Sequence, residues 1–139
     1  LGQRETATEN IPMLNGQTPV HLTFTSGSAD CYDVIAVQGY EADAVEAMRQ
    51  YLLTLSGEQL QNLNKTPPEM RSECMMANLI YAPVRHLDAG FPLREWDYRG
   101  YLRELVNIET LDIDESLFRL DPEYRIYELS ASGLPAQVN

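Results

Sequence analysis

The sequence predicts an α+β fold, with an antiparallel sheet and a few helices between N-terminal and C-terminal strands. Segments with strand character lie near both ends of the chain, and segments with helical periodicity lie between them. The 139 residues suit one hydrophobic core, and the 44% hydrophobic composition is typical of a globular protein. We therefore expect a flexible N-terminal tail over residues 1–19 and a single domain over residues 20–139.

Two strands are expected directly after the tail. Residues 1–19 are polar and show no apolar period, whereas residues 20–25 alternate between apolar and polar side chains. This alternation predicts a half-buried strand, which ends at the turn Ser26-Gly27-Ser28. The run CYDVIAVQ over residues 31–38 is almost wholly apolar and rich in β-branched side chains, as is typical of a central strand covered on both faces.

Helical patterns follow these strands. Residues 41–55 predict an amphipathic helix, because their apolar residues recur at helical spacing. Ser56 and Gln59 have the spacing of a capping box, which predicts that a second short helix begins at Ser56. The run Thr-Pro-Pro-Glu over residues 66–69 predicts the start of a third helical segment that carries Cys74.

The second half of the chain is less regular. The run MANLIYA over residues 76–82 predicts a strand, and residues 83–94 predict a loop because they hold two prolines and a glycine. Residues 95–110 fit a helix face in part, but Tyr98, Gly100 and Tyr101 oppose that interpretation. Near the C-terminus, residues 117–120 and 124–129 predict a hairpin around an Asp-Pro-Glu turn.

The chain has two cysteines, Cys31 and Cys74, which form either one disulfide or two separate thiols. Their spacing does not decide between these alternatives. A disulfide would close a loop of roughly 40 residues and stabilise the fold by about 4 kcal/mol in the chain-entropy model. We expect the disulfide, which requires an oxidising compartment.

The net charge of −11 argues against nucleic acid or an anionic membrane surface as a partner. The longest apolar run is far shorter than the ~20 residues of a membrane-spanning helix. The polar N-terminal segment fits a mature exported protein. We therefore expect membrane contact only through a lipid anchor upstream of residue 1.

Candidate residues for catalysis are sparse. The chain has no G-x-S-x-G motif, and only His21 and His86 could act as imidazole bases. His86 and Asp88 would begin a zinc site but lack a third ligand. Residues 112–123 imitate the outer positions of a calcium loop, but Leu117 stands where glycine is required. We expect no cofactor, no metal site and no enzymatic activity, although carboxylate pairs leave a small hydrolase as an alternative.

An acidic and aromatic stretch is the most distinctive feature of the chain. Residues 104–128 contain eight acidic and two basic residues, a net charge of −6, and aromatic residues lie within and just before them. Aromatic side chains beside charges are common in protein interfaces. The alternative is a solvated acidic face over an aromatic core. The residues predicted to bind a protein partner are Trp96, Asp97, Tyr98, Asp114, Glu115, Glu123 and Tyr124.

Residues 20–129 taken together resemble a periplasmic immunity protein of a bacterial type VI secretion system. The resemblance lies in HLTFTSGSADCYDVIAVQGY, EADAVEAMRQYLLTL, PPEMRSECMMANLIYAPVRHLDAGFPLREWDYRGYLREL and FRLDPEYRIYEL. The similar family, of Pseudomonas type, neutralises a secreted peptidoglycan muramidase. This resemblance implies an exported periplasmic lipoprotein that binds the toxin and occludes its glycan cleft without catalysis. The alternative is a non-catalytic binding or scaffold lipoprotein of the envelope.

Overall fold

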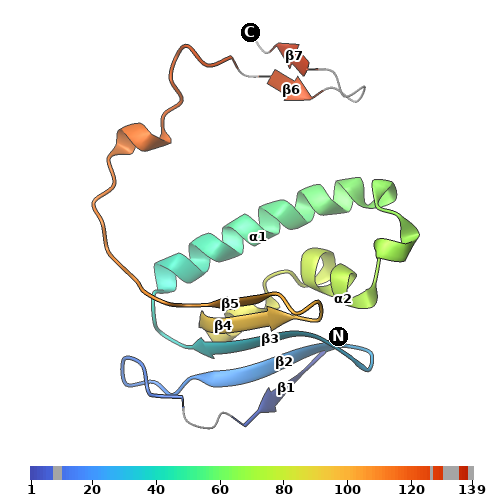
Figure 1. Cartoon of the computed structure of the whole chain (residues 1–139), viewed down its shortest axis with the longest axis vertical. Coiled ribbons are helices and arrows are strands. Elements are labelled where there is room, and N and C mark those ends of the chain that lie inside the picture. The colour runs from blue at the N-terminus through green and yellow to red at the C-terminus, as the bar shows by residue number, and fades with distance from the viewer. Residues whose placement is uncertain (8–10, 126, 130–134, 138–139) are drawn as a thin grey trace. The chain divides into compact units, whose positions relative to one another are not determined.

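A computed structural model describes residues 1–7, 11–125, 127–129 and 135–137. The chain divides into two compact units, Leu1–Val106 and Asn107–Asn139. The first unit contains a five-stranded antiparallel sheet in the order β1-β2-β3-β4-β5 (Figure 1). The predicted α+β class is therefore confirmed. The strands are β1 (Gly2–Thr6), β2 (Val20–Ser26), β3 (Ala29–Val37), β4 (Phe91–Asp97) and β5 (Leu102–Glu104).

The prediction of a flexible tail over residues 1–19 was wrong for residues 2–6, because β1 pairs with β2 from Gly2 opposite Thr25 to Thr6 opposite His21. The guanidinium of Arg4 also donates two hydrogen bonds, of 2.6 and 2.7 Å, to the carboxylate of Asp30. An edge strand of this kind is held by backbone hydrogen bonds, so its side chains need no apolar alternation. The polar sequence of β1 therefore gave no sign of a strand.

The predicted strands over residues 20–25 and 31–38 are confirmed as β2 and β3. β3 lies between β2 and β4, and its third residue Cys31 and its last residue Val37 are fully buried. The hydrophobic core cluster consists of Phe24, Val34 and Ala36 from the sheet and Ala89 from outside it.

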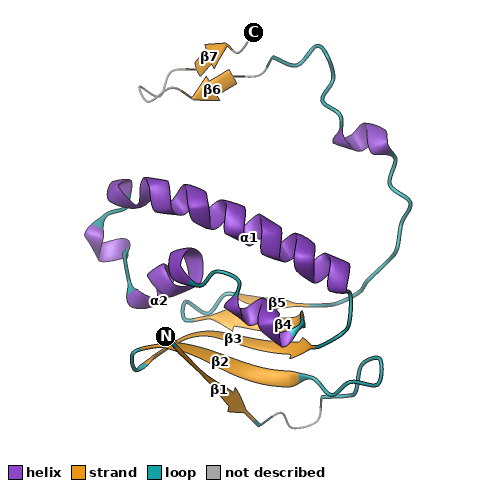
Figure 2. Ribbon diagram, turned by 180° about the vertical axis from the view of Figure 1, so that it is seen from behind, coloured by secondary structure: helices purple, strands orange, loops and turns teal. Residues whose placement is uncertain are grey.

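The helix predicted over residues 41–55 is confirmed as the first part of α1 (Ala42–Asn62), which continues seven residues further. The second helix expected from Ser56 was wrong. The hydroxyl of Ser56 lies inside α1 and donates a 3.0 Å hydrogen bond to the carbonyl of Ile80. Both α1 and α2 (Glu73–Met76) lie on one side of the sheet (Figure 2).

The strand expected over residues 76–82 was also wrong. Ser72 caps α2 by accepting a 3.1 Å hydrogen bond from the backbone N–H of Met75. The helical path then continues as a π-helix, η3 (Ala77–Tyr81). The buried residues Cys74, Ala77 and Ile80 recur every third position, a helical period that the apolar run concealed.

Residues 83–94, expected to be a loop, contain the 3₁₀ helix η4 (Arg85–Ala89) and the start of β4. Residues 95–110, whose pattern was ambiguous, include the hairpin formed by β4 and β5. Its turn is closed by a 2.9 Å hydrogen bond from the N–H of Gly100 to the carbonyl of Asp97. The buried residue Glu95 of β4 is charged, so the sequence did not show the apolar alternation that predicts a strand.

The second unit contains a short 3₁₀ helix, η5 (Glu115–Phe118), and two strands, β6 (Tyr127–Leu129) and β7 (Pro135–Gln137). The predicted hairpin of residues 117–120 with residues 124–129 was wrong, because β6 pairs with β7. Ile126, part of that expected hairpin, lies outside the described residues. Asp114 starts η5 by accepting a hydrogen bond from the N–H of Ser116, so Leu117 and Phe118 lie in a 3₁₀ turn and not in a strand.

Candidate functional site

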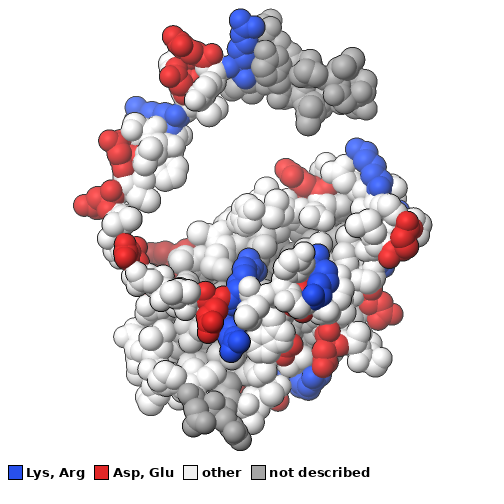
Figure 3. Space-filling view, in the orientation of Figure 1, with Lys and Arg blue, Asp and Glu red and all other residues white. Residues whose placement is uncertain are grey.

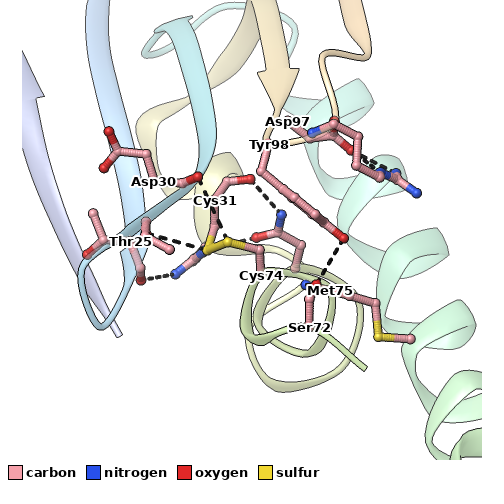
Figure 4. Close-up of a disulfide and its surroundings, with 12 residues drawn as sticks. Thr25, Asp30, Cys31, Ser72, Cys74, Met75, Asp97 and Tyr98 are labelled. Atoms are coloured by element: carbon pink, nitrogen blue, oxygen red, sulfur yellow. Dashed lines mark hydrogen bonds and ion pairs between the residues drawn. A yellow bond between two sulfur atoms is a disulfide. The ribbon is translucent and has the colours of Figure 1, made fainter. Parts of the chain in front are cut away.

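The predicted disulfide between Cys31 and Cys74 is confirmed (Figure 4). It joins β3 to α2, with the two Cα atoms 4.8 Å apart. The carbonyl of Cys31 also accepts hydrogen bonds from the Asn78 side chain at 2.9 Å and from the N–H of Tyr98 at 3.2 Å. One residue therefore connects the sheet, the helical layer and the tip of the β4–β5 hairpin.

The tip of this hairpin, residues 97–101, is held in one conformation by Asp97. Its carboxylate accepts hydrogen bonds from the backbone N–H groups of Arg99 and Tyr101, at 2.8 and 3.2 Å. The Arg99 side chain adds a 2.8 Å bond from Nε. Burial by itself would raise the pKa of Asp97, but these hydrogen bonds outweigh it and hold the pKa below its ordinary value.

Two tyrosines present their rings from this ordered tip. Tyr98 is 42% exposed and Tyr101 is 68% exposed. The Arg99 guanidinium lies 4.8 Å from the ring centre of Tyr101 and 5.7 Å from that of Tyr98. The Tyr98 hydroxyl lies 3.2 Å from Ser72 Oγ, and Figure 4 shows the two side chains pointing toward each other. The tip is therefore an aromatic surface anchored to α2, and its one guanidinium pairs with Asp97 at 2.7 Å.

A groove of about 480 Å³ runs beside the tip. One wall is mostly apolar and comes from α1, α2 and η3. The other wall carries polar side chains from the β4–β5 hairpin. Its lining includes Tyr51, Leu52, Leu55, Met75 and Leu79 on the first wall, and Glu95, Asp97, Tyr98, Arg99, Tyr101 and Arg103 on the second.

Glu95 organises the polar side of this groove. One of its carboxylate oxygens accepts a 2.6 Å hydrogen bond from the hydroxyl of Tyr32, and the other pairs with Arg103 at 2.7 Å. Burial, followed by the charge of Glu95 and its hydrogen bond, raises the pKa of Tyr32 well above its ordinary value. Tyr32 thus remains a neutral donor and fixes the buried carboxylate.

His86 lies under the same cluster. Its ring centre is 5.0 Å from that of Tyr32, and its Nε2 has no hydrogen-bond partner among the described residues. The nearest Glu95 oxygen lies 3.9 Å from that nitrogen, too far for a hydrogen bond. Burial, and then the positive charge of Arg103, Arg85 and Arg49, lowers the pKa of His86 to about 4. The imidazole is therefore neutral at neutral pH.

This lowered pKa predicts an acid-sensitive fold. The pKa of His86 is about 4 in the folded chain against 6.5 for an unperturbed histidine, so the unfolded state binds the extra proton between these values. The free energy of unfolding should fall by roughly 3 kcal/mol as the pH drops across that window. Urea unfolding of the wild type and of His86→Gln at pH 7, 5.5 and 4 measures this contribution. Equal pH dependence in the two proteins would contradict it.

Of the seven predicted binding residues, Asp97 and Tyr98 lie at the tip and line the groove. Trp96 lies between them and Glu95 in the sequence, but successive strand residues face opposite sides of a sheet. Its ring instead packs against that of His21, with 5.2 Å between the ring centres. Arg99 and Tyr101 lie within residues 96–101, a segment in which the sequence predicts a binding surface, although neither is among the seven residues named for it.

The other four predicted residues belong to the second unit, and all are exposed. Asp114 caps η5, and Glu115 pairs with Arg119 at 3.3 Å. Glu123 and Tyr124 lie in the turn that begins at Asp121, whose carboxylate accepts a 2.9 Å hydrogen bond from the N–H of Glu123. The seven predicted residues therefore fall into two groups, one in each unit.

Within the described part of the chain, no three His, Cys, Asp or Glu side chains gather as metal ligands would. The helices described there are also too short or too polar to span a membrane. No protein-family model, no curated protein and no solved structure matches the chain.

Proposed function

We propose that this chain is an immunity protein that binds a type VI secreted muramidase in the periplasm and blocks its glycan-binding cleft. The observation that carries the proposal is the tip at residues 97–101, which presents Tyr98 and Tyr101 from a hydrogen-bonded turn. The identity of the toxin is supported by the family resemblance of residues 20–129. The chain itself acts by occlusion and performs no catalysis.

A fixed aromatic tip suits a blocking role. Tyrosine buries a large area at small entropic cost, and it is enriched among the residues that dominate binding energy. Because Asp97 already orders the turn, docking loses little conformational freedom. A muramidase cleft offers surfaces for sugar rings and polar subsites, which tyrosine rings and hydroxyls and the Arg99 guanidinium can occupy.

Charge and compartment support the same proposal. The chain carries a net charge of −11, so a basic toxin would be attracted to it and would associate faster at low salt. The Cys31–Cys74 disulfide is of the kind that persists in oxidising compartments such as the bacterial periplasm.

The Tyr101 ring provides the sharpest test. Tyr101→Ala should weaken toxin binding by about 1–3 kcal/mol, because it removes an exposed aromatic anchor without touching the core. The matched control is Tyr81→Ala, since Tyr81 in η3 is 66% exposed and Tyr101 is 68% exposed, but Tyr81 does not line the groove. Tyr98→Phe, which removes only the hydroxyl near Ser72, measures the contribution of the anchor to α2.

The measurement uses surface plasmon resonance against the protein encoded by the neighbouring open reading frame, together with its turnover of peptidoglycan. The wild-type chain should bind that protein, stop its muramidase activity and show no turnover alone. Equal affinities for Tyr101→Ala and Tyr81→Ala would place the contact elsewhere. A neighbouring product that is not inhibited, or turnover by the chain itself, would overturn the proposed function.

A further inference from the structure

Residues 107–125 leave large apolar side chains in solvent. Every residue of this stretch is exposed. Leu117 and Phe118 are 76% and 77% exposed, and Leu111, Ile113 and Leu120 are each more than half exposed. Scattered single apolar residues are normal on a surface, but a run of them such as residues 111–120 is typical of an interaction site.

The same stretch carries the start signals of a helix. The Asp114 carboxylate accepts a 2.8 Å hydrogen bond from the N–H of Ser116, as an N-cap does. Ile113 and Phe118 stand at the two positions of a hydrophobic staple, before the cap and four residues after it. Glu115 pairs with Arg119 one turn later. The helix nevertheless consists only of the 3₁₀ turn Glu115–Phe118.

Length explains why this helix stops early. Pro122 disfavours helical backbone at Asp121, so at most two turns can form after Asp114. A helix of this length is marginal in water unless its apolar face packs against another surface. Leu117 and Leu120 stand three residues apart, and would share one face of such a helix.

The charges of residues 112–123 indicate which kind of surface this segment can bind. Residues 112–123 contain five acidic residues and one basic residue, a net charge of −4. Figure 3 shows acidic groups at intervals along the stretch, separated by uncharged side chains. A second copy of this chain, nucleic acid and an anionic membrane all carry negative charge and would be repelled. An apolar groove bordered by lysine or arginine is the complementary surface.

We propose that residues 115–120, capped by Asp114, fold into a helix when they dock in an apolar groove with a basic rim on the toxin. This inference rests on the proposed function, because it takes the inhibited muramidase as the partner. The apolar face supplies the anchors, and the acidic residues around it select the basic rim. The docking element is distinct from the tyrosine tip at residues 97–101.

Two substitutions at one exposed position isolate helix formation. Arg119→Ala and Arg119→Gly remove the same charge, but glycine disfavours a helix by an amount that corresponds to about a five-fold change in affinity. In the full chain, Arg119→Gly should bind the protein encoded by the neighbouring open reading frame about five-fold more weakly than Arg119→Ala does. Leu117→Ala should weaken binding at least ten-fold, whereas Val106→Ala, at an exposed apolar position outside the helix pattern, should not.

Hydrogen exchange on the full chain provides the structural readout. The amides of residues 118–120 should be weakly protected in the isolated chain, where the Arg119 N–H bonds only within the single turn of η5, and should become strongly protected in the complex. Equal affinities for the two Arg119 variants, or absent protection, would overturn the docked helix while inhibition and the Tyr101 effect leave the proposed function standing. If the neighbouring protein binds and distinguishes the two Arg119 variants but has no muramidase activity, the docked helix stands and the proposal that the partner is a muramidase is overturned. A neighbour that does not bind would overturn both.

Discussion

Replacing Cys31 and Cys74 together by alanine is expected to lower the free energy of unfolding by about 4 kcal/mol. The disulfide spans 43 residues of sequence, so its loss frees a long loop in the unfolded chain. Both sulfur atoms are buried, and alanine keeps the site apolar. Urea unfolding of the double variant and of the wild type measures the difference.

Reduction of the wild type separates the bond from the side chains. If the disulfide stabilises the fold through the unfolded chain, the reduced wild type and the double alanine variant should have similar midpoints. A variant whose unfolding free energy changes by less than about 1 kcal/mol would show that the contacts between β3 and α2 hold without the bond.

Gly90→Ala is expected to be similarly damaging, with a loss of about 4 kcal/mol from backbone strain and overpacking together. Gly90 has φ 108° and ψ −154°, a region that is essentially limited to glycine. A Cβ at this position would lie 2.2 Å from the carbonyl oxygen of Val37. The clash involves the backbone of β3 and not the end of a flexible side chain, so it cannot be relieved locally.

Gly57→Ala is the matched control for this substitution. Gly57 lies inside α1, and a Cβ there would meet no described atom within 4 Å. Alanine should therefore stabilise α1 by roughly 0.5–1 kcal/mol. Chemical denaturation of the two variants side by side should shift in opposite directions, and a Gly90→Ala protein as stable as the wild type would contradict the close approach of η4 to β3.

Strong local patterns made part of this fold predictable. The alternation in residues 20–25 and the buried run in residues 31–38 each correspond to a strand, because burial on one or both faces leaves its mark in the sequence. The helical period over residues 41–55 fixed most of α1. The disulfide was expected from the even number of cysteines and the exported interpretation, and not from their spacing in the sequence.

The missed elements depend on partners that are distant in sequence. β1 is defined by β2, and β4 buries Glu95 only because Tyr32 and Arg103 satisfy its carboxylate. The candidate site was predicted only in part for the same reason. Asp97 and Tyr98 were named from composition, but the groove beside them is created by α1 and α2 packing near the hairpin.

The polar strand β1 also affects how the molecule behaves at high concentration. An uncovered β2, with its run VHLTFTS, would offer unpaired backbone groups and strand-forming side chains to neighbouring molecules. β1 covers that edge and presents instead a strand that carries Arg4 and Glu5. At the opposite edge, β5 is only three residues long. Charged and short edges resist edge-to-edge aggregation, so the unexpected N-terminal strand contributes to colloidal stability as well as to the sheet.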